Sequence, residues 1–404
     1  MNRVGSNIYV STAIYWQMPS PQAFSEQVAW TLAKGRWALI RIPHDSVPGI
    51  TSALEMALSH VHYDNEKLAR LHIDDGMNVP MEVGTVFERK HMHAIDLAKQ
   101  SNGVSSVILE YSGDSASRNC RQYLVDFEAA CRSTNNITNG TRLLVLSRQP
   151  LHDLRTPKAS SVQDIVFSGA LSYREMRAYV YMRTDRIGPG TIPLVPALIA
   201  EFAGYDPLLA EQLMALPLEA LLNLPHPLDA LLALDTHRWR AGQWSAGAVA
   251  EIDGRTYRHA LYDQYLATHP GPEQDTAITA LKRRYWQACI QAVMPWLELR
   301  RPLVMSILKP SVQRFLQSTG EKLYNRSDRP DYEIDIEDLE YNRIVGLVYK
   351  QNLRIAADAE AQLAFKVCCL AKKLRDSLAH IRCPGPRDLV DLAEAMDYLV
   401  PEVA

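Results

Sequence analysis

The sequence lacks a long hydrophobic run, a surplus of either charge and any paired cysteine motif. No apolar stretch approaches the ~20 residues that a membrane-spanning helix needs. The net charge is only −3, which argues against a protein that coats nucleic acid with a basic surface. The six cysteines form no C-x-x-C pair and no cluster with histidine at zinc spacing. We therefore expect no structural metal.

The N-terminus also lacks the pattern of a secretory signal, in which a charged segment precedes an apolar one. Most of the cysteines lie in apolar segments that read as helices, where a free thiol acts as a small hydrophobic side chain. Free thiols are typical of a reducing compartment. These observations predict a cytoplasmic protein that does not associate with a membrane.

The composition is that of a globular protein with more than one domain. Of the 404 residues, 47% are hydrophobic and 22% are charged. This length exceeds that of one ordinary hydrophobic core, so we expect two or three domains. The patterns along the chain divide it into residues 1–172, 173–270 and 271–404.

Residues 1–172 alternate short apolar runs with amphipathic segments. Apolar strands separated by helices predict a parallel sheet covered on both faces, which is an α/β fold. The expected strands are Trp37–Ile42, Leu68–Ile73, Val107–Tyr111, Leu143–Leu146 and Asp164–Phe167.

The remaining residues, 173–404, have a helical pattern. Prolines separate short helices in residues 173–270, and Asp253-Gly254 suggests a small hairpin. In residues 271–404 we expect an all-α bundle. Its first helix, Asp275–Arg300, is expected to break at Pro295, and a charged loop is expected over 325–338. Further helices are expected over about 338–350, 358–381 and 387–399.

The segment after the first predicted strand lies where a phosphate-binding P-loop would occur. Only Gly49 and Thr51 match the pattern G-x-x-x-x-G-K-[ST], and Ile50 stands in place of the lysine. The third predicted strand carries Glu110 near the position of the acidic residue that assists such sites. Without the lysine we expect hydrolysis to be lost. Three readings stay open: no nucleotide bound, nucleotide bound without hydrolysis, and a working ATPase. We favour a degenerate domain.

The order of these elements, followed by helices, resembles the ATPase core and helical lid of AAA+ and STAND proteins. The resemblance covers about residues 30–240 and is closest to the inactive STAND modules of bacterial conflict systems. It implies a sensing or docking module, with Gly49, Thr51 and Glu110 as nucleotide-binding residues if a nucleotide binds.

A second candidate site lies near the C-terminus. Arg375 and His380 are separated by four residues at the end of an amphipathic helix. On an ideal helix these residues lie about 140° apart, so one helix cannot easily direct both at a single phosphate. A second copy of the chain in a symmetric dimer could complete the site.

The segment Arg375-Asp376-Ser377-Leu378-Ala379-His380 resembles the R-[ND]-x-L-A-H motif of HEPN domains. These domains are helical bundles that commonly dimerise, and many cleave RNA without a metal. The resemblance implies catalytic roles for Arg375, Asp376 and His380. Histidine titrates near neutral pH and suits acid–base catalysis. Arginine stays charged and can stabilise a developing phosphorane.

Two other interpretations of the motif stay open. HEPN-like domains without activity keep the same pattern for packing or dimerisation, and His380 can simply interact with the negative end of its helix. The leading hypothesis is a component of a bacterial antiphage system that cleaves RNA and binds protein partners of the same system. The alternative is an adaptor without enzymatic activity, in which both regions bind protein partners.

Overall fold

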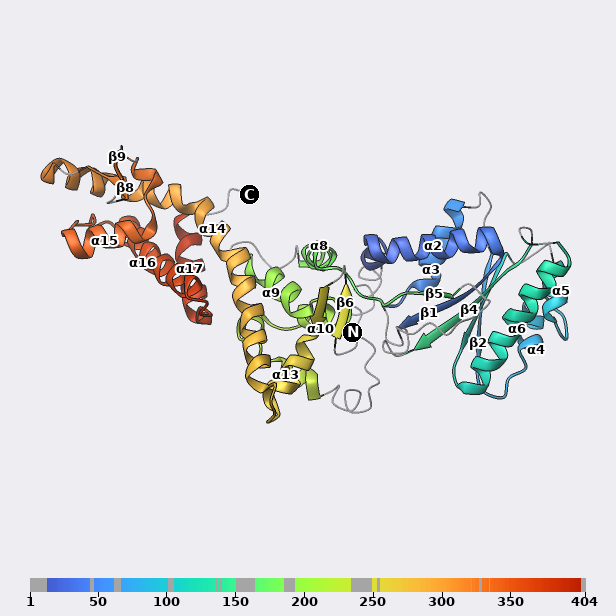
Figure 1. The fold of residues 1–404 in the computed structure, drawn as a ribbon. Coiled ribbons are helices and arrows are strands. Elements are labelled where there is room, and N and C mark those ends of the chain that lie inside the picture. Colours follow the sequence, from blue (N-terminus) through green and yellow to red (C-terminus); the bar gives the residue numbers. More distant parts are fainter. Residues whose placement is uncertain are drawn as a thin grey trace. The chain divides into compact units, whose positions relative to one another are not determined.

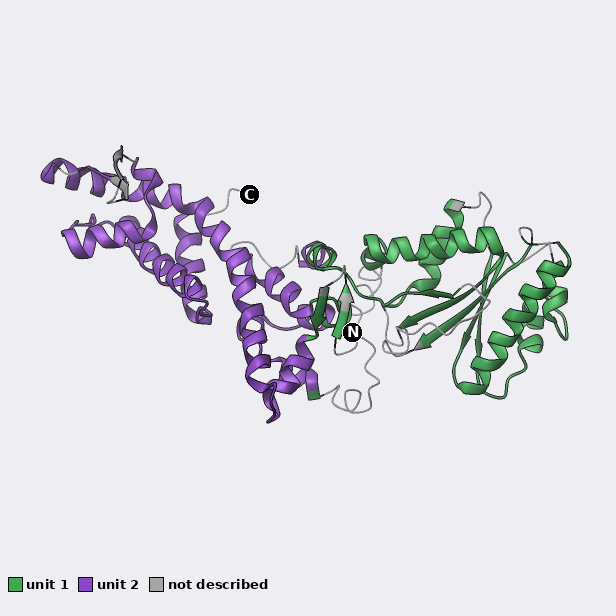
Figure 2. Ribbon diagram, in the orientation of Figure 1, with its two compact units in different colours: residues 1–179, 204–209, 233–259 green, residues 180–203, 210–232, 260–404 purple. Residues whose placement is uncertain are grey.

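The computed structural model of the chain contains two compact units (Figure 2). Unit 1 comprises residues 1–179, 204–209 and 233–259, and unit 2 comprises residues 180–203, 210–232 and 260–404. The residues that the structure describes are 13–43, 47–61, 67–100, 105–135, 137, 140–149, 164–184, 193–233, 249–252, 255–320, 322–326, 329–333 and 335–400. Residues 194–203, which the sequence pattern assigned to a helical lid, thus group with the C-terminal helices, and the divisions at 172 and 270 stay predictions.

Unit 1 is built on a parallel sheet with strand order β2-β3-β4-β1-β5. The predicted α/β region followed by a helical region is confirmed, and a strand forms at each of the five predicted places. The strands are β1 (Trp37–Pro43), β2 (Leu68–Ile73), β3 (Ser106–Tyr111), β4 (Arg142–Gln149) and β5 (Asp164–Val166).

Helices cover both faces of this sheet, as Figure 1 shows. The chain passes from β1, near one edge of the sheet, to β2 at the opposite edge. It then returns through the neighbouring strands β3 and β4, in the opposite direction across the sheet. Because such crossovers are right-handed, the two directions place helices on opposite faces. Helices α2 (Pro19–Gly35) and α3 (Ile50–Val61) lie on one face; α4 (Val79–Val86), α5 (Ala94–Lys99) and α6 (Asp114–Ser133) lie on the other.

Helix α6 shows how the sequence specifies this packing. Cys120, Leu124, Phe127 and Cys131 recur at helical spacing and are buried against alternate residues of the strands. The helix begins after Gly113, whose φ of 91° is a conformation that glycine adopts without strain. A Cβ atom at Gly113 would lie 2.4 Å from a carboxylate oxygen of Asp75, so a larger residue would displace that side chain.

Unit 1 also contains the predicted hairpin. Strands β6 (Val249–Ile252) and β7 (Arg255–Arg258) pair in antiparallel fashion, as the turn signal predicted. Asp253 and Gly254 themselves lie outside the described residues. Helix α8 (Tyr173–Thr184) crosses the division between the units.

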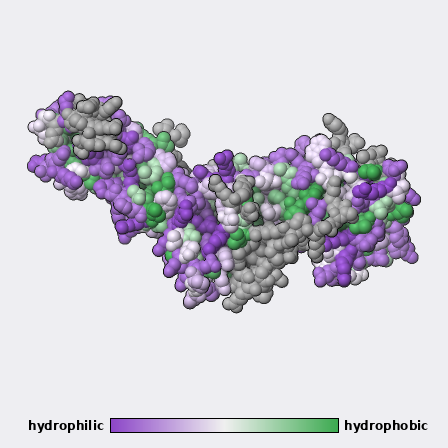
Figure 3. All heavy atoms as spheres, viewed as in Figure 1, coloured by the Kyte–Doolittle hydropathy of each residue, from purple (hydrophilic) through white to green (hydrophobic). Residues whose placement is uncertain are grey.

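Unit 2 is helical. It contains α9 (Leu194–Ala203), most of α10 (Pro207–Met214), α11 (Leu218–Leu222), α13 (Ala260–Thr268), α14 (Gln274–Thr319), α15 (Tyr341–Gln351), α16 (Ala359–Ala379) and α17 (Pro386–Leu399). The three last helices confirm the predicted ones to within a few residues. On the face drawn in Figure 3, hydrophilic residues cover much of the surface of both units, with smaller hydrophobic groups between them.

The predicted break at Pro295 is wrong, because α14 is one helix of 46 residues that continues through this proline. The helix also contains Pro302 and Pro310, and all three prolines are exposed. A proline removes one backbone hydrogen bond and bends the helix. On an exposed side the freed carbonyl groups can bind water, and the bend directs the buried side around the core. Figure 1 shows α14 as a continuous, bent helix.

The predicted charged loop over 325–338 is also wrong in part. Strands β8 (Tyr324–Arg326) and β9 (Arg329–Glu333) form an antiparallel pair, and a short 3-10 helix, η1, spans Ile336–Asp338. Lys309 of α14 pairs with Glu337 at 2.5 Å, and Arg301 donates to the carbonyl of Asp338 at 2.7 Å. Charged side chains therefore attach η1 to α14.

Candidate functional site

The loop after β1 is the first sequence-predicted site. Gly49 has a φ of 96° and accepts a hydrogen bond from the amide of Ala53, so it begins helix α3. Thr51 is half-buried in the first turn of that helix. Residues 44–46, which complete the P-loop-like segment, lie outside the described residues. The carboxyl edge of a parallel sheet beside such a turn is where ligands commonly bind.

Two features of this turn differ from a phosphate site. Ile50 is only 2% exposed, so the residue at the lysine position points into the core rather than toward a ligand. The indole of Trp16 donates a 2.7 Å hydrogen bond to the carbonyl of Pro48, which fixes the chain just before Gly49. The position that supplies a cation in a working P-loop therefore supplies packing here.

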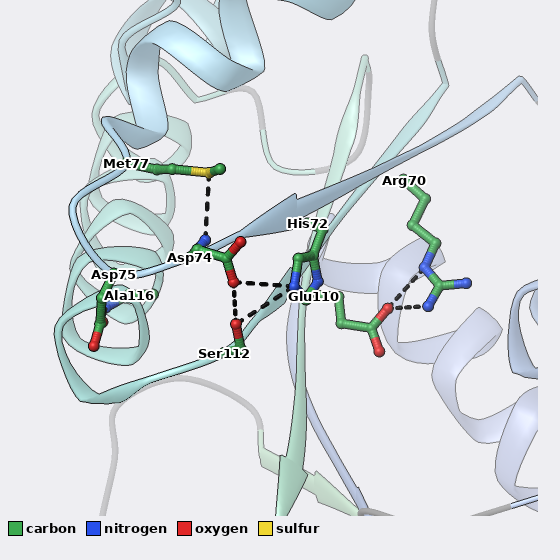
Figure 4. A network of polar contacts seen from close by, with 8 residues as sticks. All are labelled: Arg70, His72, Asp74, Asp75, Met77, Glu110, Ser112 and Ala116. Atoms are coloured by element: carbon green, nitrogen blue, oxygen red, sulfur yellow. Dashed lines mark hydrogen bonds and ion pairs between the residues drawn. The ribbon is translucent and has the colours of Figure 1, made fainter.

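Glu110 lies away from this turn and is enclosed by arginines. In the sheet, Glu110 pairs with Leu146 of β4, and Leu146 pairs with Ile40 of β1. Glu110 is therefore at the level of a residue that precedes the end of β1 by three positions. Arg148 donates to one carboxylate oxygen of Glu110 at 2.6 Å, and Arg70 donates to the other at 2.7 Å. Figure 4 shows Arg70 and Glu110 facing each other across β2 and β3.

The arginines decide the charge state of Glu110, whose side chain is 7% exposed. Burial alone would raise the pKa of this carboxyl, but the hydrogen bonds from Arg148 and Arg70 hold it below its ordinary value. Both oxygens of the ionised carboxylate are occupied by guanidinium groups. The predicted acidic residue is thus already neutralised by this chain and is not directed at a metal ion.

A polar cluster lies beside Glu110 at the ends of β2 and β3 (Figure 4). Its Asp74 follows a predicted strand, a common position for an acidic site residue, but sequence reasoning missed His72 and Ser112. His72 Nε2 lies 3.1 Å from Asp74 Oδ1 and 3.4 Å from Ser112 Oγ, and Ser112 also contacts Asp74. In a catalytic serine site, one ring nitrogen of the histidine contacts the serine hydroxyl and the other ring nitrogen contacts the carboxylate. Here both groups meet the same nitrogen, so the cluster does not activate Ser112.

The second sequence-predicted site is at the surface of unit 2. Arg375 and Asp376 line a groove of about 250 Å³ between α14, α15 and α16. The apolar side of this groove is formed by Ile290, Met294, Leu378 and Ala379, and the polar side by Asn342, Lys372, Arg375 and Asp376. The structure thus brings two of the three motif residues to one groove.

Ion pairs within the chain hold both of these residues. Arg375 Nη1 lies 3.1 Å from Glu340 Oε2, and its side chain is 25% exposed. Asp376 lies 2.6 Å from the ammonium of Lys372 one turn earlier. Glu340 precedes α15 and is 35 residues away in sequence, so nothing in the motif identifies it as a partner of Arg375.

His380 ends the same helix but does not line the groove. It is exposed, and its amide bonds to the carbonyls of Asp376 and Ser377. The amides of Ile381 and Arg382 bond back to Leu378 and Ser377, which is the Schellman arrangement of a helix end. Ile381 adopts a φ of 55° there, an unusual conformation for a β-branched residue. The expected angle between Arg375 and His380 agrees with this placement.

No group of three or more histidine, cysteine, aspartate or glutamate residues in the described part of the chain is arranged to hold a metal ion. Among the described helices, none combines the length and the apolar character needed to cross a bilayer. No family model matches the chain, and no curated protein matches it either. The site geometry therefore carries the functional argument.

Proposed function

We propose that this protein is a component of a bacterial antiphage system, acting in the cytoplasm, whose C-terminal helices form a HEPN-type domain that cleaves RNA without a metal. In this proposal Arg375 contacts the scissile phosphate, His380 transfers protons at the ribose 2′-hydroxyl, and Asp376 holds Lys372 beside the site. Arg375 and His380 point to different sides of the same helix and cannot both reach one phosphate. Two copies of the chain therefore form each site.

The observation that carries the proposal is the exposure of the motif residues. His380 is exposed at the end of α16, and Arg375 and Asp376 line a groove that opens to solvent. If these side chains were packed inside the bundle, neither RNA nor a second copy could reach them. Buried Leu374 and Leu378 on the same helix anchor it against α14, so the motif has a rigid support.

The direct test is cleavage of labelled tRNA and mRNA by the purified full chain in EDTA. We expect cleavage by the wild type, and a loss of roughly 10²-fold or more for Arg375→Ala and for His380→Ala. Arg387→Ala and His269→Ala are matched controls, because both residues are exposed and lie outside the groove. Sedimentation of the same samples measures the dimer that the site requires.

Absence of cleavage by the wild type, with candidate trigger RNA or partner protein added, would reject the nuclease. Equal activity of the motif variants and their controls would assign any cleavage to a contaminant. Circular dichroism of each variant separates loss of a catalytic group from loss of the fold.

We further propose that unit 1 senses or docks a partner without hydrolysing nucleotide. The burial of Ile50 and the occupation of both Glu110 oxygens by arginine support this proposal, because a working site needs a cation and a free acidic group there. Calorimetry with ATP and magnesium tests it. Binding without phosphate release is compatible with the proposal, whereas turnover contradicts it.

A second candidate function is an adaptor that binds protein partners and has no catalytic activity. One observation favours it specifically: the chain's own Glu340 and Lys372 already pair with Arg375 and Asp376. In an adaptor these ion pairs would be permanent parts of the surface. A wild type that never cleaves RNA but forms a stable complex with a partner would favour this function.

A further inference from the structure

The groove beside Arg375 has the chemistry of an anion site. The ammonium of Lys372 and the guanidinium of Arg375 both line it. The carboxylate of Asp376 lines it as well and pairs with Lys372 at 2.6 Å, so the surplus positive charge of the lining is that of Arg375. Asn342 also lines it from the first turn of α15, where backbone amides lack partners within the helix. The groove volume of about 250 Å³ is several times the ~30 Å³ that a water molecule occupies in the liquid. It can therefore hold a group larger than water.

An anion from the chain itself contacts this site. Glu340 occupies the N-cap position of α15, yet its side chain makes no capping hydrogen bond to that helix. Its carboxylate instead lies 3.1 Å from Arg375 Nη1. At the start of α16 the N-cap is the shorter Asp358, which accepts from the amide of Ala361 at 2.8 Å. The Glu340 carboxylate thus contacts the arginine and not the start of its own helix.

We infer that Glu340 is a built-in competitor of an RNA phosphate, which must displace its carboxylate from Arg375 before the groove can bind RNA. This inference rests on the proposed function for the identity of the ligand. It adds regulation of the groove by a residue outside the motif. Glu340 is a gating residue in this scheme, since it acts through Arg375 and not on the reacting atoms.

The exposure of the pair makes the exchange feasible. The Glu340 side chain is 52% exposed, and that of Arg375 is 25% exposed, so water screens their attraction. Exposed pairs of this kind shift an equilibrium by about five-fold at most. A phosphate offers more oxygen acceptors to a guanidinium than this single 3.1 Å contact uses, and it forms the stronger paired hydrogen bonds. RNA therefore competes successfully once it is present.

The test measures binding separately from cleavage. The full chain is titrated into a fluorescent single-stranded oligoribonucleotide carrying 2′-O-methyl groups, which blocks attack by the ribose oxygen. We expect Glu340→Gln to bind this probe about five-fold more tightly than the wild type, the equivalent of one exposed ion pair. The gain should disappear when Arg375→Ala is combined with Glu340→Gln, because the two residues act as one unit.

Glu337→Gln is the matched control, since Glu337 is a nearby glutamate that pairs with Lys309 outside the groove. It should leave probe binding unchanged. A gain for Glu340→Gln that persists without Arg375, or no gain at all, overturns the inference even if the wild type cleaves RNA. An Arg375-dependent gain in a protein that cleaves no RNA supports the gating role while rejecting the nuclease.

Discussion

Each unit contains a glutamate paired with arginine, and the two pairs differ in enclosure. Glu110 in unit 1 is 7% exposed and receives hydrogen bonds from both Arg148 and Arg70. Glu340 in unit 2 is 52% exposed and has one contact, from Arg375. Removing the cations from a buried carboxylate costs much free energy, because an unpaired charge is then left in the interior. An exposed carboxylate loses little, because water replaces its partner. The difference separates charges that hold the fold from charges that a ligand can displace.

Arg36 is another enclosed charge of unit 1, and its substitution should lower the free energy of unfolding most. Its guanidinium is fully buried and donates to the carbonyl of Thr141 at 2.7 and 3.0 Å and to that of Ala98 at 3.2 Å. Arg36→Met leaves both carbonyls without these donors, so we expect a loss of about 3 kcal/mol in the free energy of unfolding. Amide hydrogen exchange in β4 measures it. Arg118→Met, at an exposed position of α6, is the control and should change little.

Glu110→Gln should have the next largest effect and a characteristic pH dependence. We expect a loss of about 2 kcal/mol at pH 7, the typical contribution of hydrogen bonds to a charged group. Because the folded state holds the pKa of Glu110 below its ordinary value of 4.5, the wild type has this stabilisation above that pH and loses it as the pH falls further. The difference between wild type and variant should therefore shrink in acid.

Urea unfolding at pH 7 and at pH 3, monitored by exchange in β3, checks this prediction. Glu55→Gln on the exposed side of α3 is the control. A difference that stays constant with pH would mean that the arginines do not hold the carboxylate in its ionised form.

A stabilising change is expected at the end of the motif helix. Ile381 adopts a left-handed conformation with φ of 55° and is 69% exposed, so its side chain gains little from packing. Ile381→Gly should increase the stability of α16 by about 1 kcal/mol, since glycine adopts this conformation without strain. Ile381→Val keeps the branched Cβ and should bring no gain. Exchange of the last amides of α16 distinguishes the two variants.

The smallest effect on stability is expected from Glu340→Gln. An exposed ion pair with one contact should contribute about 0.5 kcal/mol or less to the free energy of unfolding. Thermal unfolding followed by circular dichroism provides the measurement. A loss comparable to that of Glu110→Gln would remove the distinction between the two pairs and assign Glu340 to the fold instead of to a gate.

The sequence predicted the strands because their signal is local. Runs such as Val107-Ile108-Leu109 are apolar on both faces, which only a covered sheet accommodates. The predicted helix break at Pro295 was wrong because the effect of a proline depends on its exposure. Pro295 faces solvent, where water can replace the lost hydrogen bond. Periodicity alone did not reveal which side of α14 would be covered.

The site residues were only partly predictable for a related reason. The motif points to Arg375, Asp376 and His380 as candidates, since these residues are close in sequence. The partners that decide their charge environment come from elsewhere. Glu340 is 35 residues from Arg375, and Arg70 is 40 residues from Glu110. Such pairs depend on strand order and helix packing, which no local pattern encodes.

The length of α14 has a practical consequence for dividing the protein into fragments. It packs against α9, α13, α16 and η1. Arg284 and Gln291 in its first half bond to Glu201 of α9, and Arg301 and Lys309 in its later part bond to η1. A fragment that starts at residue 271 would keep α14 but remove α9 and α13, which would uncover part of the buried side of α14. An expressed fragment of this kind should associate through that surface. A dimer seen only in the fragment would then reflect the cut and not the native assembly.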